Sequence, residues 1–200
     1  MNFNLKIILF YVNSIFVKIF RIMSLKDNYF QLKNNKYVYL GQNFYFGNHC
    51  RIETINYYRG KAYTPKLIIG NNVHLENRVH IGCLNKVLLG DNILIGSNVL
   101  ITDHNHGYYD SAHINLHENP LKVAPAYRML TLDSEVIIER NVWIGENVVV
   151  LPNTYIAEGT IIAANSVVKG RLDSFSIYAG NPCKKIKYYN KEKKQWSKNE

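Results

Sequence analysis

Cysteine is scarce in this chain, and its few occurrences carry no recognisable signature. The 200 residues contain only Cys50, Cys83 and Cys183. An odd number of cysteines cannot all pair within one chain, and these spacings match no short metal-binding motif. A disulfide framework is therefore not expected, and we predict neither a metal site nor a secreted protein. The composition favours the reducing cytosol.

A long uninterrupted apolar run is also lacking. Most residues from 3 to 23 are apolar, but the longest clean run is residues 7–12, because Lys6, Lys18 and Arg21 are among the interruptions. A membrane-spanning helix needs roughly 20 mostly apolar residues. No small-residue cleavage site typical of a secretory signal follows. We predict instead an N-terminal amphipathic helix within residues 1–36, lying on a membrane surface. Packing on a neighbouring subunit or on the end of the domain fits equally well.

Acidic residues are outnumbered, at 15 against 24 lysines and arginines, which gives a net charge of +9 at pH 7. The lysines gather at the two ends of the chain, so nucleic acid binding is not expected. A basic C-terminal tail, residues 183–200, suits the phosphates of an anionic cofactor. A basic apolar N-terminus suits anionic lipid. We therefore expect a cytoplasmic protein that contacts the inner face of a membrane peripherally.

Helical periodicity is absent from the middle of the chain, where aliphatic residues recur in a six-residue phase instead. A helix would place them three and four apart, and an amphipathic strand two apart. The positions in phase are Ile69, Leu75, Ile81, Leu89, Ile95, Ile101, Ile138, Ile144, Val150, Ile156, Ile162 and Val168. Glycine, asparagine or aspartate often follows, and these residues tolerate the positive φ of a tight corner.

This phase predicts an all-β fold, a parallel β-helix with a corner every six residues. Three corners close a triangular coil of 18 residues, with one aliphatic side chain per corner stacked on an interior column. The positions form four coils, and a weaker set at Leu40, Phe46 and Ile52 adds a fifth. We assign the solenoid domain to residues 37–182.

The repeat breaks twice. One break is a modest loop between Ile52 and Leu67, and the other is an insertion over residues 103–133. Long insertions in compact domains are uncommon unless they serve a function. The larger one begins with Asp103-His104-Asn105-His106, so we place the active site at its base. A single histidine in a loop is most often a polar surface residue, but two of them at the start of the longest insertion favour catalysis.

Several segments together resemble the left-handed β-helix, hexapeptide-repeat O-acetyltransferases of sugars and surface polysaccharides. They are Ile101-Thr102-Asp103-His104-Asn105-His106, the long loop, Asn141-Val142-Trp143-Ile144-Gly145 and Ala179-Gly180-Asn181-Pro182. The likeness covers roughly residues 67 to 189. It implies left-handed coils, acetyl-CoA as cosubstrate without a metal, a carbohydrate acceptor and a homotrimer with sites between subunits. It also leads us to expect a short helical C-terminal tail.

The resemblance assigns a general base to this loop. Histidine suits the task because its ordinary pKa of roughly 6.5 leaves it able to accept a hydroxyl proton near neutral pH. By the family's pattern the base falls on His106, with His104 the runner-up. Asp103 would orient either ring.

The resemblance also suggests binding residues. The expected cofactor-binding residues are Trp143, Gly145, Glu146, Ala163, Ala164, Lys169, Lys185 and Lys187. Glu146 departs from the small residue common in the family, so the oxyanion donor near Gly145 stays open. The acceptor candidates are Tyr108, Tyr109 and Tyr127, because aromatic side chains stack on sugar faces.

Three other functions remain open. An N-acetyltransferase of an amino sugar or xenobiotic would use the same fold, and an amine needs less help from a base. A γ-type carbonic anhydrase needs three zinc-binding histidines, whose spacing does not map onto this chain. A non-catalytic β-helical binding module would not require the histidine loop.

Overall fold

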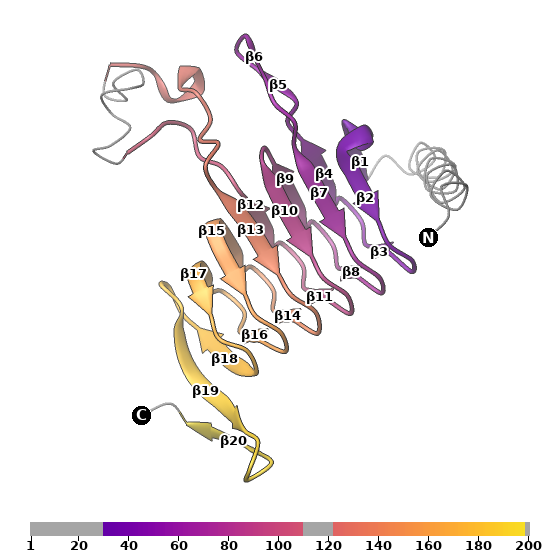
Figure 1. Ribbon diagram of the computed structural model, residues 1–200, viewed down its shortest axis with the longest axis vertical. Coiled ribbons are helices and arrows are strands. Elements are labelled where there is room, and N and C mark those ends of the chain that lie inside the picture. The colour runs from indigo at the N-terminus through magenta and orange to yellow at the C-terminus, as the bar shows by residue number, and fades with distance from the viewer. Residues whose placement is uncertain (1–29, 110–121, 199–200) are drawn as a thin grey trace, which may run out of the picture.

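The computed structural model describes residues 30–109 and 122–198. The chain winds into a triangular prism of parallel strands, with two protrusions from one edge, after β4 (Arg51–Thr54) and after β12 (Leu100–Thr102), and a C-terminal hairpin at one end (Figure 1). Five full coils follow one another from residue 38 to residue 168, which confirms the predicted parallel β-helix and its coil number.

Each of the three faces of the prism is a row of parallel strands, and β15 (Val149–Ile156) joins the first two faces into one continuous sheet. The first face holds β1 (Gln31–Lys33), β4 (Arg51–Thr54), β9 (His80–Cys83), β12 (Leu100–Thr102) and the first part of β15 (Val149–Ile156). The second holds β2 (Val38–Leu40), β7 (Lys66–Ile69), β10 (Lys86–Leu89), β13 (Glu135–Ile138) and the end of β15. The third holds β3 (Tyr45–Phe46), β8 (His74–Leu75), β11 (Leu94–Ile95), β14 (Trp143–Ile144), β16 (Ile161–Ile162) and β18 (Ser176–Ala179). Like β15, β17 (Val167–Leu172) continues from the first face to the second.

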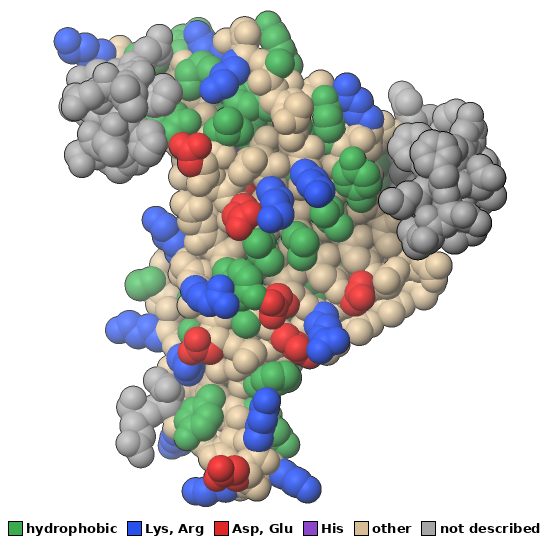
Figure 2. Space-filling model, viewed as in Figure 1, with side chains coloured by type: hydrophobic (Ala, Val, Ile, Leu, Met, Phe, Trp, Pro, Cys, Tyr) green, Lys and Arg blue, Asp and Glu red, His purple; other side chains and the backbone are tan. Residues whose placement is uncertain are grey.

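The core is the interior of the prism. All twelve aliphatic residues of the six-residue phase are at most 1% exposed. They stack in register, as in Leu75, Ile95, Ile144 and Ile162 on the third face. Each fully buried aliphatic side chain contributes roughly 1.5–3 kcal/mol. The outward positions carry charged and apolar side chains, which intermingle on the face shown in Figure 2.

The coils differ in length, which the regular phase does not predict. Ile144 pairs with Ile162, as an 18-residue coil requires, but Leu75 pairs with Ile95, 20 residues on. The additional residues, Leu84 and Asn85, lie at the corner between β9 and β10, beside the buried Asp103. The insertion begins with this same aspartate.

Asparagines hold the corner between the second and third faces. Asn72, Asn92 and Asn141 have φ of 55°, 57° and 59°. The left-handed region costs most L-residues about 1–2 kcal/mol, and asparagine tolerates it better. The Asn72 amide donates to Asn92 at 2.9 Å, and the Asn92 amide donates to Asn141 at 3.2 Å. The corner residues therefore also tie successive coils together.

The predicted helical C-terminal tail is wrong. Residues 184–198 form an antiparallel hairpin of β19 (Lys184–Asn190) and β20 (Gln195–Lys198), and β19 pairs with β18. An open sheet edge exposes unpaired backbone groups, and the tail satisfies them.

The N-terminal region is described only from residue 30, so the amphipathic helix expected in residues 1–36 lies mostly outside the described residues. Within that segment β1 pairs in parallel with β4, and the short 3₁₀ helix η1 (Asn35–Tyr37) follows it. The sheet therefore begins before residue 37. Across 30–109 and 122–198, no helix has the length and apolarity to cross a membrane.

The asparagine ladder leads to a stability prediction. Asn92→Gly keeps the left-handed corner but loses the amide bonds, whereas Asn92→Ala loses both. We expect both variants to melt earlier, with Asn92→Ala less stable than Asn92→Gly by about 1 kcal/mol. Thermal unfolding followed by circular dichroism tests this. Equal melting temperatures for the two variants would contradict the corner argument.

Candidate active site

A cavity of about 290 Å³ lies where the inserted loop meets the first face of the prism. It is lined by Lys33, Asn34, Glu53, Thr54, Ile55, Tyr57, Tyr58, His104, His106 and Leu130. One wall is the hairpin of β5 (Tyr57–Tyr58) and β6 (Lys61–Ala62), which projects beside the inserted loop (Figure 1). The two breaks in the repeat therefore build one site.

Contacts between the hairpin and the loop hold this wall in place. The Tyr58 hydroxyl donates a hydrogen bond to the Ala126 carbonyl at 2.8 Å. The Arg59 guanidinium lies 4.7 Å from the centre of the Tyr127 ring, within the range of a cation–π contact. Residues 125–127 form the short 3₁₀ helix η2 (Pro125–Tyr127).

Asp103 is the anchor of the site. Its side chain is fully buried, and its carboxylate accepts three hydrogen bonds of 2.8 Å from the backbone N–H groups of Leu84, Asn85 and Lys86. A buried charge is tolerated only where hydrogen bonds replace water. The residues that lengthen this coil supply those donors, so the wide corner and the aspartate depend on each other.

The same carboxylate orients His104. Nδ1 of His104 lies 2.9 Å from Oδ1 of Asp103 and 3.2 Å from Oγ1 of Thr102. An ionised carboxylate can only accept, so Nδ1 carries the hydrogen and Nε2 carries the lone pair. The side chain is 13% exposed and lines the cavity. His104 thus has the geometry of a general base held by a third group.

Gly82 explains where the His104 ring lies. A Cβ atom on Gly82 would be only 3.3 Å from Cε1 of His104, so the ring packs over the glycine. Glycine inside a strand often marks a close approach of this kind. The ring consequently lies over β9, the neighbouring strand from the preceding coil.

His106 is placed differently. It is exposed, its ring meets the Tyr58 ring edge-on at 5.9 Å, and its backbone forms an isolated bridge with Leu130. It lines the same cavity as His104. Since the Asp103 carboxylate contacts His104, the geometry favours His104 over the first choice made from the sequence.

Charged side chains of three coils meet beside the cavity. Glu53 lies 3.4 Å from Nζ of Lys33, 3.4 Å from Nε2 of His80 and 3.8 Å from Arg51. Burial raises the pKa of the Glu53 carboxyl, but the charges of Arg51 and Lys33 outweigh this and hold the pKa below its ordinary value. Glu53 is therefore ionised at neutral pH.

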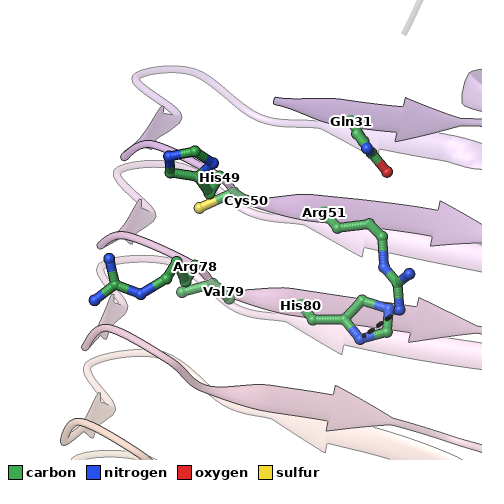
Figure 3. A pocket seen from close by; sticks show the side chains of 7 residues that line it. All are labelled: Gln31, His49, Cys50, Arg51, Arg78, Val79 and His80. Atoms are coloured by element: carbon green, nitrogen blue, oxygen red, sulfur yellow. Dashed lines mark hydrogen bonds between the residues drawn. The ribbon is translucent and has the colours of Figure 1, made fainter. Parts of the chain in front are cut away.

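His80 is the neutral member of this group. Burial and the Arg51 charge lower its pKa, against the opposing effect of Glu53. Arg51 lies 3.1 Å from Nδ1 and must donate to it, as Figure 3 shows, so the hydrogen is on Nε2. A second hollow of about 320 Å³, drawn in Figure 3, lies beside this pair on the first face.

The tyrosines expected to bind the acceptor brace the inserted loop instead. Tyr109 donates to the His106 carbonyl at 2.7 Å and accepts from Arg128 at 2.8 Å. The Tyr108 hydroxyl accepts from the Leu132 N–H at 3.2 Å. Neither residue lines the cavity, and nor does Tyr127. Tyr57 and Tyr58 of the hairpin are the tyrosines that do.

The residues expected to bind the donor lie elsewhere on the prism. Trp143 is half-exposed on the third face and pairs with Ile161. Gly145 approaches Ala164 so closely that a Cβ would lie 2.7 Å from its backbone nitrogen. Trp143, Gly145, Glu146, Ala163 and Ala164 thus occupy neighbouring coils, but none of them lines the histidine cavity.

The predicted phosphate-binding lysines differ in their surroundings. Lys185 forms an ion pair with Asp173, which holds its ammonium group at the base of the hairpin. Lys169 is exposed on β17. Lys187 pairs through its backbone with Ile177 and Lys198. Lys169 and Lys187 therefore remain candidates for phosphate binding.

Sequence reasoning missed Lys33, Glu53 and Tyr58. The only signal was the break after Ile52, which marks the hairpin without naming its contacts. No group of three or more metal-ligating side chains gathers in the parts of the chain that the structure describes.

Comparison with known proteins places the chain in a family. Residues 135–170 match the family model for the bacterial transferase hexapeptide of six repeats. The chain is 38% identical over 170 residues to the putative lipopolysaccharide biosynthesis O-acetyl transferase WbbJ of Escherichia coli K12, covering 84% of this chain and 80% of WbbJ. The chain belongs to the bacterial hexapeptide-repeat transferase family.

Two further matches are a partial sequence match and a similarity of fold. The chain is 42% identical over 66 residues to a probable macrolide acetyltransferase of Lysinibacillus sphaericus, covering 33% of this chain and 37% of that protein. Its fold is similar to the crystal structure of AntD, an N-acyltransferase from Bacillus cereus, with a TM-score of 0.60 and 21% identity over 82% of this chain and 78% of AntD. The predictions of a left-handed β-helix and of an acyltransferase are confirmed.

The Asp103 geometry leads to a prediction for this transferase. Asp103→Asn places an amide where three backbone N–H groups need an acceptor and where His104 needs a carboxylate. We expect a fall in kcat of roughly 10²-fold or more, since a positioned base is worth about 10²–10⁴-fold. Asp91→Asn is the matched control, because Asp91 also accepts a backbone N–H, from Asn71, at a distant corner.

The measurement is kcat together with thermal unfolding of both variants. We expect Asp103→Asn also to melt earlier, since it leaves buried donors without their acceptor. Unchanged kcat in a folded Asp103→Asn protein would refute the orienting role.

Proposed function

We propose that this protein is an acetyl-CoA-dependent O-acetyltransferase that acetylates a hydroxyl of a sugar or surface polysaccharide, with His104 as the general base. The observation that carries the proposal is the contact between the buried Asp103 and Nδ1 of His104 in a cavity at the base of the inserted loop. WbbJ is named for O-acetyl transfer in lipopolysaccharide biosynthesis, and AntD was solved with dTDP and 3-hydroxybutyryl-CoA.

The chemistry follows from the protonation state. A neutral hydroxyl is a poor nucleophile, and Nε2 of His104 accepts its proton as the oxygen bonds to the acetyl carbonyl carbon. The thiolate of coenzyme A leaves, and the proton on Nε2 neutralises it. Asp103 stabilises the imidazolium that forms between these steps. Base assistance of this kind matters more for a hydroxyl than for an amine, which favours O-acetylation over the N-acetyltransferase alternative.

The donor side is completed by a second copy of the chain. Trp143 lies on the third face, and His104 follows a strand of the first face, so one chain does not bring them together. Along the third face an outward row of mainly apolar side chains continues from coil to coil: Tyr45, His74, Leu94, Trp143, Ile161 and Ile177. A cyclic assembly joins two different patches of each chain.

The arrangement that meets these conditions is a homotrimer in which the third face of one chain packs on the first face of the next. Trp143, Gly145, Glu146, Ala163 and Ala164 would then flank the donor thioester across from the partner's cavity. Lys169 and Lys187 would meet the phosphates of acetyl-CoA, as charge partners of an anionic ligand. The contact of residues 1–36 with the cytoplasmic face of a membrane stays a prediction.

The choice between the two histidines is tested by alanine substitution. His104→Ala should lower kcat/KM by about 10²–10⁴-fold, the usual worth of a positioned base. His106→Ala should lower it far less, because its ring is exposed and Asp103 orients the other histidine. Coenzyme A release over a panel of sugars and surface glycans gives the measurement. A larger loss in His106→Ala would restore the assignment made from the sequence.

The trimer is tested by sedimentation. The wild type should sediment as three 23.2 kDa chains. Leu94→Glu puts a charge into the apolar row of the third face and should yield monomers without activity. Ile137→Glu, at an outward position on the second face, is the matched control and should stay trimeric. Dissociation by the control alone would place the interface on the second face.

A further inference from the structure

Glu53 is the acidic group of the cavity, and the proposed reaction leaves it without a role. It lies on β4, in the coil where the described part of the prism begins, and lines the same cavity as His104. Its side chain is 20% exposed, so its carboxylate can meet a ligand there. Its contacts with Lys33, His80 and Arg51 are 3.4–3.8 Å long. Charge-assisted hydrogen bonds are shorter, about 2.7–2.9 Å, so the oxygens keep capacity to accept more.

The strand register fixes the relation of Glu53 to His104. Glu53 pairs with Gly82, and Gly82 pairs with Thr102, two residues before the histidine. Two strand spacings, about 10 Å, therefore separate Glu53 from Thr102. Gly82 fills none of this interval with a side chain, and the His104 ring lies over it. The carboxylate and the imidazole thus approach the same cavity from opposite sides of a glycine.

The charges limit what fits between them. Glu53 is ionised and can only accept hydrogen bonds. Lys33, 57% exposed, balances its charge at the cavity rim. A phosphate or carboxylate placed against Glu53 would be repelled, whereas sugar hydroxyls are donors that a carboxylate binds well. Tyr57 and Tyr58 supply aromatic surface beside it.

We propose that Glu53 is an acceptor-binding residue, which takes a hydrogen bond from one hydroxyl of a neutral sugar ring while the neighbouring hydroxyl lies at Nε2 of His104. This inference rests on the proposed O-acetyltransferase function and adds the recognition of two adjacent hydroxyls. It separates Glu53 from the chemical step: the carboxylate binds the acceptor and takes no proton from it.

Binding is tested apart from catalysis in His104→Ala protein, with methyl hexopyranosides of glucose, galactose and mannose as probes. Saturation-transfer NMR should detect at least one of these sugars on the protein. Adding Glu53→Gln should weaken that binding about tenfold or more, the loss expected for a hydrogen bond to a charged group. Glu135→Gln is the matched control, because Glu135 pairs with Lys86 at 2.8 Å outside the cavity.

Kinetics on the trimer with intact His104 give the second readout. Glu53→Gln should raise the KM for the sugar about tenfold and leave the KM for acetyl-CoA unchanged, because the lost hydrogen bond belongs to the acceptor alone. The deoxy derivative of the sugar, which lacks the neighbouring hydroxyl, should be a poor substrate for wild type. Its KM should be the same in Glu53→Gln as in wild type.

Four results would overturn the role of Glu53. In the binding experiment, they are unchanged sugar binding when Glu53→Gln is added to His104→Ala, or an equal loss of binding when Glu135→Gln is added. In the kinetic experiment, they are a raised KM for acetyl-CoA in Glu53→Gln, or a loss of activity on the deoxy sugar as large as the loss on the parent sugar. If wild type and Glu53→Gln acetylate a sugar with the same kinetics, the role of Glu53 is disproved and the proposed function stands. If His104→Ala protein binds none of these sugars and wild type releases coenzyme A with no member of the panel of sugars and surface glycans, both the role of Glu53 and the proposed function are disproved.

Discussion

The buried carboxylate of Asp103 is the constraint on which the site depends. A charge without water must be met by hydrogen bonds, and three backbone N–H groups at one corner meet it. Those donors exist because this coil is two residues longer than the regular repeat. The oxygen that Leu84 contacts also holds Nδ1 of His104. The tautomer of the histidine is therefore set by the same interaction that shapes the corner.

The prism is the rigid scaffold, and the side chains of the proposed site lie in or beside the two breaks in its repeat. Aliphatic columns and asparagine corners fix the coils one strand spacing apart, so residues far apart in sequence come into register. Glu53, Gly82 and Thr102 are neighbours for this reason alone. The hairpin and the inserted loop then close the cavity over that register. In the proposed function, the donor-side residues lie on the third face, and for that reason a second chain is needed to complete the site.

Much of the fold could be predicted from the sequence, because a six-residue phase has few physical solutions. Ile69, Leu75 and Ile81 are buried as the phase requires, and the asparagines after such positions turn the corners. The C-terminal tail could not be predicted in this way, since its strands form in response to the open edge of β18. The role of the extra corner residues Leu84 and Asn85 could not be predicted. The spacing of eight residues between Ile81 and Leu89 shows that two residues are added, but not that their backbone N–H groups bind Asp103.

The site was predicted in outline only. The cluster Asp103, His104 and His106 indicated a loop whose two histidines line the cavity. Two histidines two residues apart cannot be ranked by geometry without knowing which one the aspartate contacts. Tyr108 and Tyr109 were reasonable aromatic candidates, yet their hydroxyls bond within the loop. Glu53 carried no motif at all: only the pairing of coils brings it to the cavity.

In the proposed mechanism, Asp103 holds the proton of His104 on Nδ1 and leaves Nε2 free to act as a base. Nitrogen-15 NMR of histidine-labelled protein reads this tautomer directly, with the signals of His104 assigned by comparison with His104→Gln. We expect a protonated Nδ1 and an unprotonated Nε2 in the neutral ring. A neutral ring protonated on Nε2 would contradict this mechanism.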